Sequence, residues 1–261
     1  MNSNTVVLLV FIPILIFAIY LMPQQWKEDY LILKISSPNI LSIIASNYVH
    51  TSLEHLLSNL LVYMAIIISL TLMGEIHRIT PQLLFFLFVI VPVIISVTNL
   101  LILPLGEAFG FSGISSAFAG LFLYIVCLHM RDFWGVKDIL PVLLIILGIN
   151  TFLLAFTNPQ LLESYPLSFM IILAVLVGLI TVNIKSIVTI LSYIWKQYLK
   201  HAGNPKQYIL RSMLFFASAV LVFSLPFIVM LPQPGVFYLV NTVAHYIGYM
   251  IGLVVGLFLC K

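Results

Sequence analysis

Long, uninterrupted apolar runs dominate this sequence and decide what it can fold into. A helix needs about 20 apolar residues to cross the bilayer core. Eight such runs are predicted, at residues 5–22, 52–73, 81–103, 112–130, 139–157, 166–184, 209–231 and 236–259. Only 7% of the residues are charged, whereas a soluble domain has roughly 25%. We therefore expect an all-α, polytopic membrane protein that forms a single domain over residues 1–261.

The charged residues lie between the predicted spans and indicate the orientation. Nine Lys and Arg residues fall after spans 2, 4 and 6 or at the C-terminus, and only Lys27 and Lys34 fall on the opposite side. The positive-inside rule then places both termini in the cytoplasm. The first run lacks a basic start and a small-residue cleavage site, so we interpret it as a retained span. The basic residues follow the topology and form no face that would predict nucleic-acid binding.

Two segments outside the spans are expected to lie at the membrane surface. Residues 40–45 are apolar but too short to cross. Residues 185–207 are basic and carry apolar side chains at helical spacing, which predicts a surface-lying helix. Those side chains are Ile187, Ile190, Leu191, Ile194 and Trp195.

Three groups of polar residues fall inside or at the ends of apolar spans, where polar side chains are costly and therefore candidates for function. His55 and Asn59 lie one helical turn apart near the start of the second span. Ser112 begins the fourth span, and His245 lies in the last. At 1.5 Å per residue, each lies about 24–28 Å from the inner end of its span. Ser112, His245 and Asn59 are therefore expected at one level, in the outer part of the bilayer.

Small residues indicate which spans approach each other. Gly248, Gly252 and Gly256 recur every four residues, and Gly113, Ala117 and Gly120 form a matching face on the fourth span. Such stripes allow close packing of membrane helices. His245 is three residues before Gly248, so packing of the two stripes brings it towards Ser112.

A serine beside a histidine can act in acyl transfer, because the imidazole accepts the hydroxyl proton. Gly110 and Gly113 flank Ser112 and allow a sharp turn into the helix. The Ser112 N–H group, with the His55 and Asn59 side chains, can hold an oxyanion. No Asp or Glu lies at this depth, which predicts a dyad. There is no H-E-x-x-H motif and no pair of acidic residues within the spans, so we predict neither a metal nor a cofactor.

Each of these residues also fits a purely structural role. Ser112 can be a helix N-cap or a small packing residue. A single histidine in a span is often only packed and hydrogen-bonded, and glycine stripes often serve packing alone. For His50 we favour a structural role, as an anchor for its loop.

The combined motifs resemble those of the rhomboid intramembrane serine proteases. They are His50-x4-His55-x3-Asn59, Gly110-x-Ser112-Gly113 with Ala117 and Gly120, and Ala244-His245-x2-Gly248-x3-Gly252. The resemblance covers the first four spans and the last. It implies Ser112 as nucleophile, His245 as base, His55 and Asn59 in the oxyanion hole, and a transmembrane helix as substrate in a prokaryotic cell membrane.

The chain departs from the family pattern in three respects. Leu41 and Ser42 stand near the position of the family's Trp-Arg pair, and Ser116 stands where an aromatic residue often supports the histidine. The family core has six spans, so two of the eight are additional, within about residues 139–231. An inactive rhomboid-like protein that binds transmembrane helices for sorting or quality control is the alternative function. A transporter or receptor would place polar residues across the inner half of the bundle, and the sequence does not.

Overall fold

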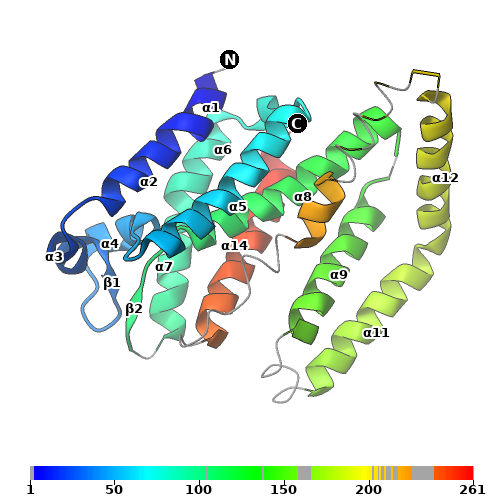
Figure 1. The fold of residues 1–261 in the computed structure, drawn as a ribbon. Coiled ribbons are helices and arrows are strands. Elements are labelled where there is room, and N and C mark those ends of the chain that lie inside the picture. Colours follow the sequence, from blue (N-terminus) through cyan, green and yellow to red (C-terminus); the bar gives the residue numbers. More distant parts are fainter. Residues whose placement is uncertain are drawn as a thin grey trace. The chain divides into compact units, whose positions relative to one another are not determined.

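The computed structural model describes residues 3–103, 105–136, 138–157, 166–201, 203–204, 206, 209, 213, 217–224 and 238–260. The described chain is mostly helical, with one two-stranded antiparallel sheet (Figure 1). It divides into two compact units. The first comprises Met1–Phe122 and Ile228–Lys261, and the second Leu123–Phe227.

The first unit contains most of the predicted spans. Its helices are α1 (Ser3–Val6), α2 (Ile12–Tyr20), α3 (Gln24–Trp26), α4 (Ile40–Ala45), α5 (Leu53–Leu72), α6 (Pro81–Phe85), α7 (Val91–Ile102), the first part of α8 (Ser112–Trp134) and α14 (Tyr238–Leu259). Its strands are β1 (Leu33–Lys34) and β2 (Glu107–Ala108). The short α4 matches the predicted segment that cannot cross a membrane.

Polar side chains begin the helices of this unit where the sequence changes from loop to apolar run. The Ser52 hydroxyl accepts from the His55 N–H group at the start of α5. Thr80 caps α6 in the same way, and Pro81 occupies the first helical position, where its missing N–H group costs nothing. Asn39 and Ser42 form a reciprocal capping box at α4.

Four helices among the described residues are long and apolar enough to cross a membrane. They are Ser3–Tyr20, Leu53–Leu72, Pro81–Ile102 and Ser112–Phe133. A bent pair, Met170–Val182 with Ile184–Tyr193, makes five if it counts as one span. The class of an all-α membrane protein is supported, and the first four predicted spans correspond to these helices by length and composition. The predicted span 209–231 lies mostly outside the described residues, and the count of eight stays a prediction, as does the single domain.

Aromatic rings from several helices fill the core of the first unit. The Tyr63 ring packs edge-on against Phe111 and Phe118, with ring centroids 5.4 and 5.2 Å apart. Its hydroxyl donates to the Leu8 carbonyl at 2.9 Å. All three rings are fully buried. The loop before Ser112 and the start of α8 are therefore fixed against α5 and the first span.

The second unit contains the rest of α8, α9 (Leu140–Thr157), α11 (Pro166–Val182) and α12 (Ile184–His201). Helices α9 and α11 pack side by side (Figure 1). Gly148 of α9 meets Leu176 of α11: a Cβ atom at the glycine would lie 3.0 Å from the leucine methyl. The predicted basic surface segment is helical, since α12 covers most of it.

Candidate active site

Ser112 and His245 meet in the first unit although 133 residues separate them. Ser112 is the first residue of α8 and His245 lies in the third turn of α14. The His245 Nε2 atom lies 2.6 Å from the Ser112 Oγ atom. His245 is buried, whereas Ser112 is partly exposed. The proximity predicted from span depth and the glycine stripes is confirmed.

Three glycines allow α14 and α8 to approach this closely. A Cβ atom at Gly252 would lie 1.8 Å from the Ala117 carbonyl oxygen, and one at Gly120 would lie 1.9 Å from the Tyr249 carbonyl oxygen. At Gly248 it would lie 2.5 Å from the Gly113 carbonyl oxygen. Because these neighbours are backbone atoms, a side chain at any of the three positions would push the helices apart. The predicted small-residue packing is therefore confirmed.

Gly113 has a further neighbour besides α14. A Cβ atom there would lie 2.5 Å from the Ile95 Cδ1 atom of α7. Position 113 therefore has no room for a side chain, because Ile95 of α7 occupies that space. The start of α8 is packed by α7 and α14 together, which fixes the direction in which Ser112 leaves the helix.

The loop before Ser112 is held by backbone contacts on both sides. β2 pairs with β1, with Leu33 opposite Ala108. The Gly110 N–H group donates to the Ser46 carbonyl at 2.9 Å. Gly110 has φ +116°, and a Cβ atom there would lie 2.8 Å from the His55 ring. Glycine is needed here for both backbone conformation and space.

His50 links α5 to this loop through one ring nitrogen. Its Nε2 atom lies 3.0 Å from the Asn59 Nδ2 atom and 3.4 Å from the Phe111 N atom. Since both partners donate, Nε2 is the acceptor and the ring carries its proton on Nδ1. Burial, with smaller contributions from His55 and Lys27, lowers the pKa of His50 to about 3. His50 is therefore a neutral anchor, in agreement with its predicted structural role.

His55 and Asn59 both lie next to the residues that lead into Ser112. The His55 ring lies against Gly110 and 5.0 Å, centroid to centroid, from the His50 ring. The Asn59 side chain is buried, and its amide has a second N–H group besides the one given to His50. Both donors of the predicted oxyanion hole are thus beside the loop, on one helix face.

Ser116 is one of the departures from the family pattern. It has no aromatic ring that could pack against the His245 imidazole. Its hydroxyl donates to the Ser112 carbonyl at 2.8 Å. A Cβ atom at Gly248 would lie 3.3 Å from the Ser116 Cβ atom. A small side chain at this position therefore belongs to the close approach of α14.

Lys27 is a residue of this region that the sequence analysis did not single out. Its side chain is only 3% exposed. Its Nζ atom donates to the carbonyls of Tyr20 and His50, each at 3.2 Å. Burial lowers its pKa. A lone lysine in a polar loop carries no sequence signal, because its burial depends on how the loop folds back onto His50.

The arrangement is suited to acyl transfer through a hydroxyl nucleophile, with an imidazole as base and neutral donors nearby. Within the described part of the chain, no cluster of three or more His, Cys, Asp or Glu side chains is placed to hold a metal ion. No family model, no curated protein and no solved structure matches this chain.

Proposed function

We propose that this protein is an intramembrane serine endopeptidase of the rhomboid type, with Ser112 as nucleophile and His245 as its base. The observation that carries the proposal is the 2.6 Å contact between the Ser112 Oγ atom and the His245 Nε2 atom. At this distance a proton can pass directly between the two groups. The partial exposure of Ser112, directly after a loop whose conformation needs glycine at position 110, supports the same role.

The first half of the reaction forms an acyl-enzyme. The Ser112 oxygen attacks the carbonyl carbon of the scissile peptide bond while its proton moves to His245 Nε2. The carbonyl oxygen becomes an oxyanion, for which the Ser112 N–H group and the side chains of His55 and Asn59 are the donors. His245 then gives the proton to the leaving amine as the carbon–nitrogen bond breaks.

The second half restores the enzyme. Water attacks the ester carbon of the acyl-enzyme, and His245 accepts the proton of the water. The Ser112 oxygen leaves and regains a proton from His245, and the product carboxylate departs. No cofactor takes part in this scheme. The scheme uses no carboxylate, and the close packing of α14 against α8 orients the imidazole towards Ser112.

The substrate in this proposal is a transmembrane helix, cut near its outer end. The oxyanion donors and Ser112 are at the start of α5 and α8, and the charge distribution favours the outer side for both. We propose a rhomboid-like core of six spans with two further spans within about residues 139–231. Both termini are proposed to lie in the cytoplasm of a prokaryotic cell.

A serine-directed fluorophosphonate probe, applied to the purified protein in detergent, tests the proposal. We expect covalent labelling of wild type, none in Ser112→Ala, and a loss of at least about 1,000-fold in rate in His245→Gln. Ser69→Ala is a matched control, because its hydroxyl only donates to Ala65 within its own helix. Cleavage of single-span membrane proteins in liposomes should show the same pattern.

Two results would reject the proposal. Labelling or cleavage retained in Ser112→Ala would place the nucleophile elsewhere. An unlabelled wild-type protein that copurifies with intact transmembrane helices would favour the inactive, helix-binding alternative.

A further inference from the structure

Helix α12 differs in character from the helix that precedes it. α11 is apolar throughout, with no charged residue between 166 and 184, and its 17 residues extend about 25 Å. The chain then bends by 61° between Val182 and Ile184. If α11 runs along the membrane normal, this bend turns α12 most of the way towards the membrane plane.

One face of α12 is apolar and exposed. Its residues follow one another at intervals of four, three, four and four positions, which is one side of a helix. They are Ile184, Val188, Leu191, Trp195 and Leu199, which are 49%, 58%, 61%, 59% and 54% exposed. We call this set the α12 stripe. A continuous row of half-exposed large side chains requires a cover, which the described residues of the unit do not provide.

Lysines flank the α12 stripe on one side. Lys185 and Lys196 are exposed and lie at about 100° and 120° from Ile184 around the helix axis. Lys200 occupies the same side of the helix, and no Asp or Glu is present between residues 166 and 201. The hydroxyls of Thr189 and Ser192 donate to carbonyls of their own helix. The free charge on this helix is therefore entirely positive.

We propose that α12 lies in the membrane interface and binds anionic lipid headgroups, with the α12 stripe in the acyl region and the lysines at the phosphates. An apolar face beside a basic flank is the pattern of an interfacial helix. Trp195 lies within the stripe, and tryptophan favours the headgroup level. The proposal is independent of any catalytic activity.

Lipid explains this pattern better than the other possible covers. A spanning helix would have to bury Lys185, Lys196 and Lys200 along its length, which is costly. A protein partner would need acidic groups opposite the lysines of α12. The described residues of α12 present lysines and apolar side chains at this surface, with no feature specific to a protein. The anionic leaflet supplies negative charge along the whole helix, and each lysine near it is worth about fivefold in local affinity.

Depth-dependent quenching of Trp195 tests the placement. The chain has three tryptophans, so Trp26→Phe with Trp134→Phe leaves Trp195 alone. In liposomes we expect stronger quenching by lipids brominated at carbons near the headgroup than by lipids brominated near the chain ends. If the double variant does not purify, the difference between wild type and Trp195→Phe gives the same signal. Stronger deep quenching, or no quenching by either lipid, would overturn the proposal.

Competition between lipids tests the charge. With phosphatidylglycerol and phosphatidylcholine brominated in turn, we expect Trp195 to prefer phosphatidylglycerol by at least about fivefold at low salt. The preference should fall severalfold in Lys185→Gln with Lys196→Gln, and remain in Lys34→Gln, a lysine of another loop. Equal quenching by both lipids, or a preference that the double lysine variant retains, would contradict anionic recognition.

Discussion

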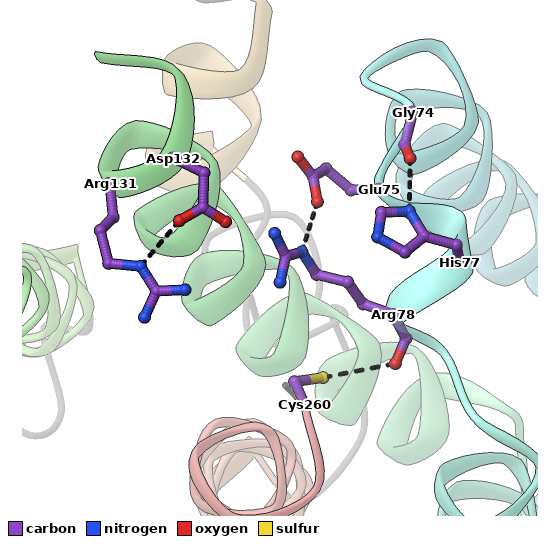
Figure 2. A network of polar contacts seen from close by, with 7 residues as sticks. All are labelled: Gly74, Glu75, His77, Arg78, Arg131, Asp132 and Cys260. Atoms are coloured by element: carbon purple, nitrogen blue, oxygen red, sulfur yellow. Dashed lines mark hydrogen bonds and ion pairs between the residues drawn. The ribbon is translucent and has the colours of Figure 1, made fainter. Parts of the chain in front are cut away.

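The two ends of α5 both carry buried polar groups, but they are built differently. At its C-terminal end, which we call the inner end after the proposed orientation, Glu75 and Arg78 form an ion pair within one turn and are 2% and 9% exposed. Figure 2 shows this pair beside the contact of the His77 Nδ1 atom with the Gly74 carbonyl. The Cys260 thiol donates to the Arg78 carbonyl at 3.8 Å. Asn4 donates to the next carbonyl, at Ile79, at 2.7 Å.

At the N-terminal end of α5, which we call the outer end after the same proposed orientation, the corresponding groups are neutral and connect different elements. Asn59 contacts His50, and His50 contacts the loop before Ser112. Lys27 is the one buried cation described there, and it contacts backbone carbonyls only. Opposite charges on one turn pair with each other, and backbone carbonyls beside them hold the two chain ends. Neutral groups that reach across elements fix a loop and can still donate to a substrate oxygen. We therefore expect substitutions at the inner end to change stability, and substitutions at the outer end to change the proposed reaction.

The largest effect is expected at the inner ion pair. Glu75→Gln removes the carboxylate that pairs with the buried Arg78 guanidinium, and breaking a buried ion pair typically costs about 3–5 kcal/mol. We expect a large drop in the melting temperature of the detergent-solubilised protein, while the probe-labelling rate of the folded fraction stays unchanged. Glu28→Gln, an exposed carboxylate of the outer loop, is the control and should melt as wild type does. If Glu75→Gln slowed labelling of the folded protein as much as substitutions near Ser112 do, the two ends would not differ in role.

The second effect is expected at the outer end, more on rate than on stability. Asn59→Ala removes a donor beside the nucleophile loop, and loss of one oxyanion donor is worth about 2.7–4 kcal/mol of barrier. We expect cleavage to slow by about 100- to 1,000-fold. The neighbouring exposed Ser58→Ala should cleave normally. A folded Asn59→Ala protein with wild-type rate would remove Asn59 from the oxyanion hole.

Lys27 allows a third test, because it belongs to the outer end but is charged. Lys27→Met leaves the Tyr20 and His50 carbonyls buried without their donor, at a cost of about 2–3 kcal/mol. We expect both a lower melting temperature and slower labelling, since His50 is held through its backbone. Lys34→Met in the same loop should change neither. Lower stability with a normal labelling rate would show that Lys27 supports the fold alone.

The helices and the meeting of Ser112 with His245 were predictable from sequence because their signals are local. Apolar runs define spans by length. The rise per residue gives depth, and glycines at four-residue spacing give the packing face, as Gly252 against Ala117 shows. None of these signals depends on how the loops fold. The roles of the two residues in a reaction still stand as proposals.

The support around the site was less predictable, because it depends on contacts across loops. Nothing local in the sequence indicates that Lys27 is buried beneath His50, or that β1 pairs with β2 next to the nucleophile. Gly110 was expected to allow a sharp turn, but the further reason for it is the His55 ring that lies against it. The bend between α11 and α12 was not predictable either, because the residue at the bend is Asn183 and not a helix-breaking proline or glycine.

The pH dependence of stability gives the smallest and sharpest test of the comparison. The pKa of His50 is about 3 in the folded protein, below its ordinary value of about 6.5. Below pH 6.5 the unfolded chain therefore binds a proton that the folded chain does not, and the free energy of unfolding falls as the pH falls. Between pH 7.5 and 5 this amounts to about 2 kcal/mol, or roughly 4–8 °C in melting temperature.

His50→Gln isolates this contribution from the other histidines. The Gln side-chain oxygen can accept from Asn59 and from the Phe111 N–H group, but it does not titrate in this range. Wild type should therefore lose more melting temperature than the variant on going from pH 7.5 to 5. Equal losses would mean that His50 protonates freely in the folded state. A freely protonated His50 Nε2 atom cannot accept the two hydrogen bonds that hold the loop before Ser112. The outer end would then differ from the inner end in charge, but His50 would not hold the loop that positions Ser112.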